Sequence, residues 1–333
     1  MNDRDTGAAL RRCASVLSRT PDSLRSQVVH RFSRNRTVAS SSPSTTASGT
    51  AMMLVRDMAY ELVPMKSAEA AIEALPVGCP VSVTCSPAKG LAATFELTTR
   101  LMERGHHVVP HISARLVESS AQVTEISGWL RLHNIREVFL VGGDAPHVLG
   151  PYGDTLTFLR ALLDTDHRLT RIGITAYPDG HALIDDGPLR DSLHAKQKLL
   201  SEATVAGYAT TQMCFDAQQI RRWLGAERAA GFTLPIHLGI PGVIDRAKLL
   251  TMGMRLGIGN SLRFVKKNGG TITRLFSPTG YDPAKLVTPV STYAEALGVE
   301  GLHTFTFNNV AATAEWQRAF LARSNNGGTR TAW

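Results

Sequence analysis

The stretch Ile135–Pro146, IREVFLVGGDAP, decides the fold class. Its central part, Glu137–Val141, is a short apolar run typical of a strand that is buried on both faces. The Gly-Gly pair predicts a turn directly after the strand, and Asp144 follows that turn. A carboxylate at the rim of a buried strand is costly to leave without a partner, so we expect Asp144 to act on something bound there.

The same design, a short apolar strand followed by a helix, recurs along the chain. Strands are expected at residues 58–65, 80–86, 107–114, 137–141, 171–177, 208–215, 233–240 and 301–307. Helices are expected at residues 67–75, 91–104, 120–133, 155–163, 189–206, 217–230, 246–256 and 311–322. Eight such units over about 270 residues predict an α/β fold, a (β/α)8 TIM barrel. Extra helices are expected within 260–298, which does not fit the repeat. An open doubly wound sheet is disfavoured because no GxGxxG motif follows the first strand.

Residues 1–50 differ from the rest in composition. Eight arginines and three aspartates give this segment a net charge of +5, which leaves +3 of the total +8 for the other residues. Its second part, Thr37–Thr50, is a Ser/Thr run with almost nothing to bury. We therefore predict a flexible, disordered basic tail at 1–50 and one barrel domain at 51–333.

Charge and hydropathy exclude several classes of partner. The excess positive charge is concentrated in the tail, and no basic stripe with interleaved aromatic residues follows it, so no nucleic-acid partner is expected. The chain has no apolar run of membrane-spanning length and no signal-peptide core, so no membrane association is expected. The four cysteines are scattered without CxxC pairs, which favours reduced thiols and a cytoplasmic location. The oligomeric state stays open.

Polar side chains are expected where the predicted strands end. Active sites of (β/α)8 barrels lie at the carboxyl ends of the strands. The residues predicted there are Glu61, Thr84, His111, Asp144, Tyr177, Asp179, His181, Gln212 and Asn308. A rim that served stability alone would not need this mixture of acids, imidazoles and amides.

The sequence around these residues resembles the methylenetetrahydrofolate reductase family. The matching pieces are YELVP at 60–64, VSVT at 81–84, VPHISA at 109–114, GGDAP at 142–146, AYPDGH at 176–181, TTQMCFD at 210–216, LGIPG at 238–242 and HTFTFNN at 303–309. They occur in the family's order and cover about residues 58–320. The resemblance implies an oxidoreductase of one-carbon metabolism and methionine biosynthesis that converts 5,10-methylenetetrahydrofolate to 5-methyltetrahydrofolate with NAD(P)H.

The resemblance also implies roles for individual residues. Glu61 matches the acid that protonates the leaving nitrogen when the folate ring opens, a task for a carboxylic acid whose pKa burial raises. Asp144 matches the carboxylate that binds the substrate and stabilises the iminium cation, and Gln212 matches the amide that reads the pterin. A cofactor-binding role is implied for Thr84, His111, Tyr177 and His181.

Two departures concern the family's flavin. The arginine two positions before the aspartate is Gly142 here, and the lysine eleven positions before the glutamine is Ser201. Because each charge-assisted bond contributes about 1.5–3 kcal/mol, losing both predicts weak FMN or FAD binding. The chain thus resembles the flavin-independent actinobacterial branch, in which NADH or NADPH delivers hydride directly. A displaced Lys198 or Lys196 could restore a phosphate contact, so a flavin-dependent reductase stays open, as does a non-catalytic folate-binding subunit.

Each candidate also has a structural alternative. Glu61 could be a structural ion-pair partner, Asp144 a helix N-cap, and Gln212 a hydrogen-bonded core amide. Packing alone explains the β-branched Thr84 nearly as well as function does. The basic residues Arg263, Lys266 and Lys267 could meet a polyglutamate tail, although a solvated helix face accounts for them better. We expect no metal site, because His106, His107 and His111 lie on one strand without a paired carboxylate.

Overall fold

Eight parallel strands close into a barrel in the computed structural model, which describes residues 46–245, 276–277 and 280–326. The order around the barrel is β1-β10-β7-β6-β5-β4-β3-β2, so each strand pairs with its neighbours in the chain and the last closes on the first. The strands are β1 Ala59–Leu62, β2 Pro80–Val83, β3 His107–Ser113, β4 Glu137–Val141, β5 Arg171–Ala176, β6 Ala206–Thr211, β7 Ile236–Pro241 and β10 Val299–Phe305. The predicted TIM barrel is confirmed.

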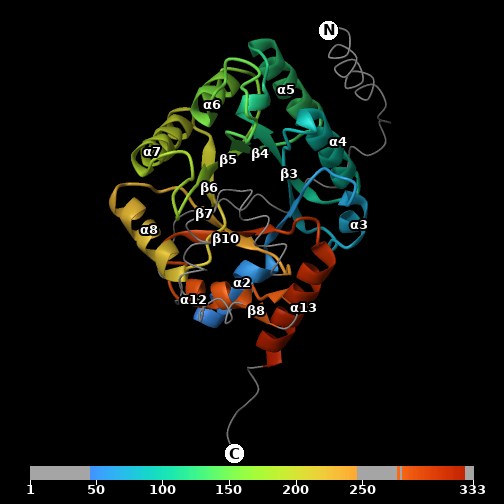
Figure 1. Cartoon of the computed structure of the whole chain (residues 1–333), viewed down its shortest axis with the longest axis vertical. Helices are drawn as coiled ribbons and strands as arrows, with labels where there is room; N and C mark the ends of the chain where they lie inside the picture. Colours follow the sequence, from blue (N-terminus) through green and yellow to red (C-terminus); the bar gives the residue numbers. More distant parts are fainter. Residues whose placement is uncertain (1–45, 246–275, 278–279, 327–333) are drawn as a thin grey trace, which may run out of the picture. The chain divides into compact units, whose positions relative to one another are not determined.

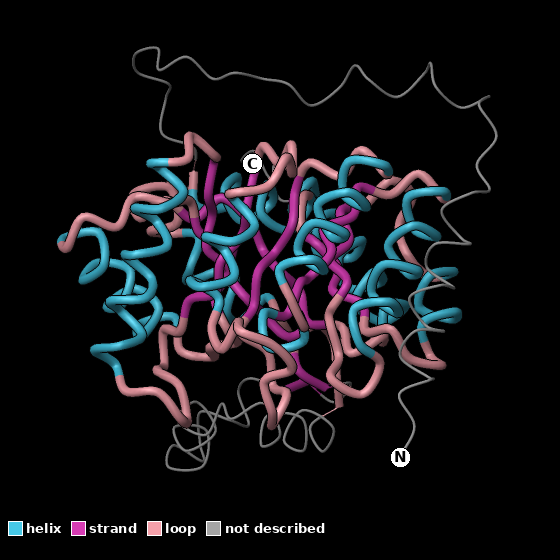
Figure 2. The backbone as a smooth tube through the Cα atoms, turned by 90° about the horizontal axis from the view of Figure 1, so that it is seen from above, coloured by secondary structure: helices cyan, strands magenta, loops and turns pink. Residues whose placement is uncertain are grey.

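Helices surround the strands as an outer layer (Figures 1 and 2). They are α3 Ala68–Glu73, α4 Gly90–Glu103, α5 Ser120–Leu132, α6 Thr155–Leu163, α7 Asp186–Glu202, α8 Ala217–Ala229, α12 Ala284–Ser291 and α13 Val310–Asn326. A short 3-10 helix, η2 Ala114–Leu116, follows β3, and a two-stranded antiparallel ribbon pairs β8 Phe276–Ser277 with β9 Gly280–Tyr281. The extra helix expected within 260–298 is α12. The helix expected at 246–256 and the cations Arg263, Lys266 and Lys267 lie outside the described residues.

Within the described residues, one helix precedes the barrel. This helix, α2 Ala47–Arg56, begins inside the segment expected to be flexible, and the compact unit starts at Thr46 rather than at residue 51. Thr46 caps it by accepting a hydrogen bond from the backbone N–H of Gly49. Its carboxyl end is tied to α13, because Gln317 donates to the Val55 carbonyl and accepts from the Tyr60 hydroxyl. The Ser/Thr-rich composition hid this helix, whose apolar contacts come only from Ala51 onward.

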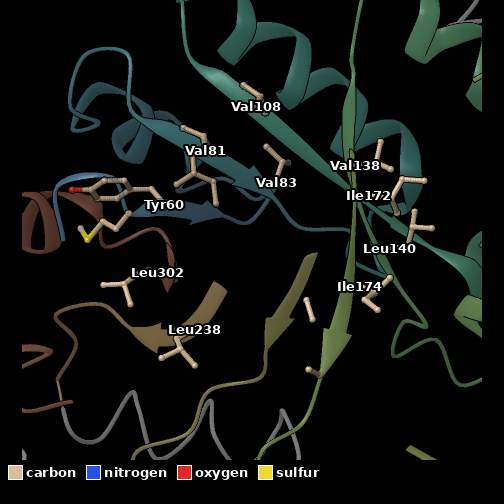
Figure 3. Close-up of a cluster of buried hydrophobic side chains, with 14 of the residues drawn as sticks. Tyr60, Val81, Val83, Val108, Val138, Leu140, Ile172, Ile174, Leu238 and Leu302 are labelled. Atoms are coloured by element: carbon tan, nitrogen blue, oxygen red, sulfur yellow. The ribbon is translucent and has the colours of Figure 1, made fainter. Parts of the chain in front are cut away.

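The main core lies between the strands and the helices. The outward-pointing strand residues are mostly aliphatic or aromatic, as the labelled side chains in Figure 3 show. Those drawn include Tyr60, Val81, Val83, Val108, Val138, Leu140, Ile172, Ile174, Leu238 and Leu302. Each is at most 6 % exposed, so this layer supplies the hydrophobic stabilisation that holds the helices on the barrel.

The alternate residues point into the barrel and are of a different kind. In place of stacked aliphatic layers, the interior holds rings and ionisable groups, among them Phe139, His111 and His303, whose rings lie 4.7–6.1 Å apart. Glycines at two strand positions leave space for aromatic rings of this interior. A Cβ on Gly173 would lie 2.4 Å from Tyr208 Cζ, and a Cβ on Gly239 would lie 2.7 Å from Phe305.

A charged cluster closes the barrel near the amino ends of its strands. Glu137 lies 3.6 Å from Arg171, whose guanidinium stacks 4.3 Å from the centre of the Tyr208 ring and donates to His237 Nε2 over 3.2 Å. Burial lowers the pKa of His237 to about 3, and the charge of Arg171 acts in the same direction. His237 is therefore a neutral acceptor. None of the described helices combines the length and apolar composition that crossing a bilayer requires.

Candidate active site

Glu61 lies at the end of β1, with its side chain inside the barrel. The residue is 5 % exposed, and its register partners are Ser82 on β2 and Phe305 on β10. Its backbone carbonyl accepts a hydrogen bond from Thr306 Oγ1 over 2.5 Å. The strand end just beyond is held by Asn308, whose side chain accepts from Val63 N–H and donates to the Val63 carbonyl. These contacts fix the position of Glu61 relative to β10.

Among the described residues, the Glu61 carboxylate has one side-chain partner, the imidazole of His303. Glu61 Oε2 and His303 Nε2 lie 2.8 Å apart, and both side chains are no more than 7 % exposed. Glu61 therefore has a structural partner, and the pair lies inside the barrel near the carboxyl end of β1. A buried acid with one partner there is also a candidate for proton transfer.

His111 on β3 lies beside this pair and belongs to a second hydrogen bond. His111 Nε2 and Ser82 Oγ are 2.5 Å apart, and the rings of His111 and His303 lie 5.8 Å apart. Burial lowers the pKa of His111 well below its ordinary value of 6.5, and His303 lowers it further. His111 is therefore neutral, and its ring forms part of the wall around Glu61.

Asp144 stands at the rim, on the loop that joins β4 to α6. The preceding Gly143 has a φ of +94°, and a Cβ there would lie 1.8 Å from Ser113 Oγ, so the position requires glycine. The next residues are tied to η2, because Arg115 Nε donates to the Ala145 carbonyl. Asp144 is exposed and does not cap α6, whose N-cap is Asp154. The helix-cap alternative for Asp144 is wrong.

Tyr177 and His181 lie on the loop after β5, next to the Asp144 loop. Their rings meet edge to face with centres 5.1 Å apart. Burial raises the pKa of Tyr177, and the charge of Asp144 raises it further, which places the aspartate close to the phenol. His181 Nδ1 accepts a hydrogen bond from the Leu183 N–H, so its ring is oriented by its own loop. The three side chains form one side of the rim.

Gln212 is partly exposed directly after β6, and its amide has a fixed orientation. Its Oε1 accepts from the backbone N–H of Met213 over 2.9 Å. With the oxygen engaged locally, the amide nitrogen is the group left to offer hydrogen bonds to a ligand. Thr84 follows β2 and is partly buried; its backbone N–H donates to the Leu62 carbonyl and its own carbonyl accepts from Thr94. Thr84 thereby secures the end of β2 beside β1.

Three of these side chains could also hold a metal ion. The donor atoms of Glu61, His111 and His303 all lie within 4.8 Å of one another, and all three residues are buried. The set differs from the three histidines considered in the sequence. His107 is exposed, with its side chain 4.0 Å from Glu137 at the other end of the barrel. The carboxylate and second imidazole come from β1 and β10 and were not visible as a local motif.

The cations considered for a cofactor phosphate lie elsewhere. Lys198 is 79 % exposed in its side chain, pairs with Glu202, and lies near the carboxyl end of α7, which leads into the amino end of β6. Lys196 is buried on the same helix. Burial lowers its pKa to about 8, partly offset by the charge of Asp154. Lys198 is thus paired at the surface and Lys196 is buried within the helix layer, so neither is presented as the lysine expected at the position of Ser201.

The arrangement separates two environments. A buried acid, Glu61, lies inside the barrel beside two imidazoles, whereas Asp144 and Gln212 lie at the partly exposed rim above it. Such a site can protonate one atom of a bound ligand while a carboxylate faces positive charge on another. Sequence reasoning gave no role to His303 or Ser82, although the alternation in HTFTFNN places His303 and Phe305 on one strand face.

Comparisons with known proteins address the fold. No family model matches the chain. Among solved structures, it is similar to an uncharacterized protein from Clostridium thermocellum that binds two copies of 5-methyl-5,6,7,8-tetrahydrofolic acid, with 11 % identity and a TM-score of 0.52 over 81 % of this chain and 95 % of that one. A GH20 β-N-acetylhexosaminidase from Streptomyces coelicolor A3(2) gives a TM-score of 0.37 at 11 % identity, over 79 % of this chain and 63 % of that one. The first likeness places the chain among α/β barrels.

Proposed function

We propose that the protein reduces 5,10-methylenetetrahydrofolate to 5-methyltetrahydrofolate, with NADH or NADPH as the hydride donor. The observation that carries the proposal is the buried Glu61 inside the barrel mouth, below a rim that carries Asp144 and Gln212. These are the three side-chain types that the reaction needs, at the strand ends where barrel enzymes act. The ordered motifs that resemble the reductase family support the same reaction.

The chemistry assigns one task to each residue. Glu61 gives a proton to the leaving nitrogen of the imidazolidine ring, so the ring opens to an iminium cation and Glu61 becomes a carboxylate. Asp144 faces that positive charge and lowers the barrier to its formation. Gln212 donates from its amide nitrogen to an acceptor on the pterin edge. Hydride from the nicotinamide then reduces the iminium carbon to a methyl group.

Folate as the substrate class has separate support. The barrel from Clostridium thermocellum binds 5-methyltetrahydrofolate, the product of the proposed reaction. Folate binding by a similar barrel makes a folate-binding protein without catalysis the second candidate. Against it, a buried Glu61–His303 pair is costly to desolvate and has no evident use in binding a pterin.

The residues do not fit the flavin-phosphate contacts implied by the family resemblance. Gly142 offers no side chain where an arginine is expected. Lys198 is exposed at the end of α7 that leads to the amino end of β6, and Lys196 is buried on the same helix. Because none of these three positions supplies a cation to an anionic flavin, we propose that hydride passes directly from the nicotinamide to the folate.

The test is a visible absorption spectrum of the purified protein, together with NADH or NADPH oxidation on addition of methylenetetrahydrofolate. Turnover by a colourless protein, not increased by added FMN or FAD, is the expected result. Turnover that depends on a yellow flavin band would overturn direct transfer and leave the reductase standing. Tight 5-methyltetrahydrofolate binding without turnover under either condition would replace the reductase with the folate-binding protein.

A further inference from the structure

We infer that His303 is a positioning residue for Glu61: its Nε2–H donates to Glu61 Oε2 and leaves Oε1 to deliver the proton. This inference rests on the proposed function and adds a residue to its proton-transfer step. The two side chains meet across the junction of β1 and β10, where Nε2 and Oε2 lie 2.8 Å apart. Among the described residues, Oε1 has no hydrogen-bond partner, so it is the oxygen available to a substrate.

The imidazole is held in place by rings on three sides. The ring of His303 lies 5.0 Å from Phe305, 6.1 Å from Phe139 and 5.8 Å from His111. Its backbone register is set by Ala59 on one side and Gly239 on the other. The two phenylalanine rings supply no acceptor for Nε2–H, and His111 Nε2 is already paired with Ser82 Oγ. The His303 donor is therefore directed at one atom, the Oε2 of Glu61.

This geometry changes the energy of the proton-transfer step. Before transfer, Glu61 is protonated on Oε1, and Oε2 accepts from His303 Nε2–H. The O–H bond of Glu61 then breaks and an N–H bond forms on the leaving nitrogen of the folate, with no net loss or gain of protons. The negative charge left on the carboxylate is shared with Oε2, where the hydrogen bond from His303 becomes charge-assisted. His303 thus stabilises the product side of the step and prevents rotation of the acid.

A second histidine–glutamate pair in the chain provides a matched control. His194 Nε2 and Glu227 Oε2 are also 2.8 Å apart, and Glu227 is 5 % exposed. This pair joins α7 to α8 in the outer layer, where Arg190 Nε is a further partner of Glu227 at 3.3 Å. Distance, atom types and carboxylate burial therefore match those of the inner pair, whereas the location, the arginine partner and the 27 % exposure of the His194 side chain differ.

The kinetic experiment compares His303→Phe, His303→Gln and His194→Phe. Phenylalanine keeps a flat ring without the donor, whereas glutamine keeps an N–H donor. We expect His303→Phe to lower kcat by about 10- to 100-fold, the loss of one hydrogen bond to a charged group, with the folate KM changed by less than about threefold. His303→Gln should recover most of that loss, and His194→Phe should lower the melting temperature while keeping kcat. Equal kcat for the two phenylalanine variants would overturn the inference.

A second measurement needs no turnover. In ¹⁵N-histidine NMR spectra of the whole protein, the His303 ring, assigned by its loss in His303→Gln, should carry its proton on Nε2. That Nε2 signal should shift in Glu61→Gln and stay in place in Glu227→Gln. An unprotonated Nε2 in the wild-type protein would overturn the inference even if the phenylalanine variant fails to fold. Absence of folate reduction in a wild-type protein whose Nε2 is protonated would instead count against the proposed function.

Discussion

Gly173 on β5 and Tyr208 on β6 are register partners, and the tyrosine ring fills the space that the glycine leaves inside the barrel. The same opening admits Phe139 from β4, since Cδ2 of that ring would lie 2.6 Å from a Cβ on Gly173. Burial raises the pKa of Tyr208 well above its ordinary value, so its hydroxyl stays protonated between two charged neighbours, Glu137 and Arg171. The Tyr208 ring can therefore occupy this position inside the barrel because residue 173 is a glycine and has no Cβ.

The first prediction is that Gly173→Ala lowers the free energy of unfolding by about 1–3 kcal/mol, the usual cost of overpacking a filled core. Chemical denaturation followed by circular dichroism measures it. Gly225→Ala is the matched control, because Gly225 lies within α8 and a Cβ there has no heavy atom within 4 Å. Alanine at that helical position should raise stability by about 1 kcal/mol. Equal effects at both sites would mean that the Tyr208 ring can move away without cost.

The second prediction concerns the acid. Glu61→Gln should lower kcat for folate reduction by about 10²- to 10⁴-fold, because the amide keeps the shape but has no acidic proton to give. Binding of 5-methyltetrahydrofolate, followed by calorimetry, should remain within about threefold of wild type, since proton transfer contributes to the transition state alone. Glu227→Gln removes the other buried carboxylate that is paired with a histidine and should leave kcat unchanged. Unimpaired turnover by Glu61→Gln would remove Glu61 from the mechanism.

The third prediction concerns Asp144, which is exposed at the rim, whereas Glu61 is buried. Asp144→Asn should lower kcat/KM by about tenfold, because a carboxylate at the solvent-exposed rim is partly screened when it faces the iminium charge. The difference between wild type and variant should shrink as salt is raised, which steady-state kinetics at several ionic strengths will measure. Asp185→Asn, on the neighbouring loop, is the control and should show neither effect. Full activity of Asp144→Asn at low salt would exclude the electrostatic role.

The fourth prediction uses the buried Lys196. Its pKa is lowered from 10.5 to about 8, so between these values the unfolded chain binds more protons and stability rises with pH. Below about pH 8 the lysine is charged in both states and the full burial cost is present. Lys196→Met should therefore stabilise the protein at pH 7 by about 1–3 kcal/mol.

The pH profile of thermal melts distinguishes this explanation from simple packing. The gain from Lys196→Met should fall as pH rises from 8 and vanish above pH 10.5, as the lysine becomes neutral in the unfolded state as well. Lys198→Met is the matched control: its side chain is 79 % exposed and only two residues away, so its effect should be close to zero at every pH. A pH-independent gain from Lys196→Met would show that the charge is not the cause.

The barrel was predictable from the sequence because its signal is repeated. Each apolar strand is short and followed by a helix with a clear amphipathic period, and segments such as Glu137–Val141 and 155–163 were located to the residue. The beginning of the described fold was not predictable in this way. The helix α2 starts among serines and alanines, and α13, the helix that holds its end, lies more than 250 residues further along the chain. Gln317, which holds the end of α2, has no local signal.

The residues of the candidate site were also predictable only in part. Glu61, Asp144 and Gln212 were predictable because each directly ends a strand-like run. The partner of Glu61 was not, because His303 lies 242 residues away and its alternation with Phe305 shows the face of the strand but not what that face meets. Only closure of β10 on β1 brings the imidazole to the carboxylate. The roles of the rim residues stay predictions.

The ionisable groups inside the barrel determine how substitutions there would affect its stability. A hydrophobic pair of similar volume in place of Glu61 and His303 would remove two desolvated polar groups, and such replacements are often neutral or stabilising. The stability of the fold therefore does not require this pair, and the outer aliphatic layer would hold the barrel together without it. A chain released from selection for its chemistry could lose the acid, keep its shape and melt at a higher temperature. Thermal stability and activity should accordingly separate most sharply at these two positions.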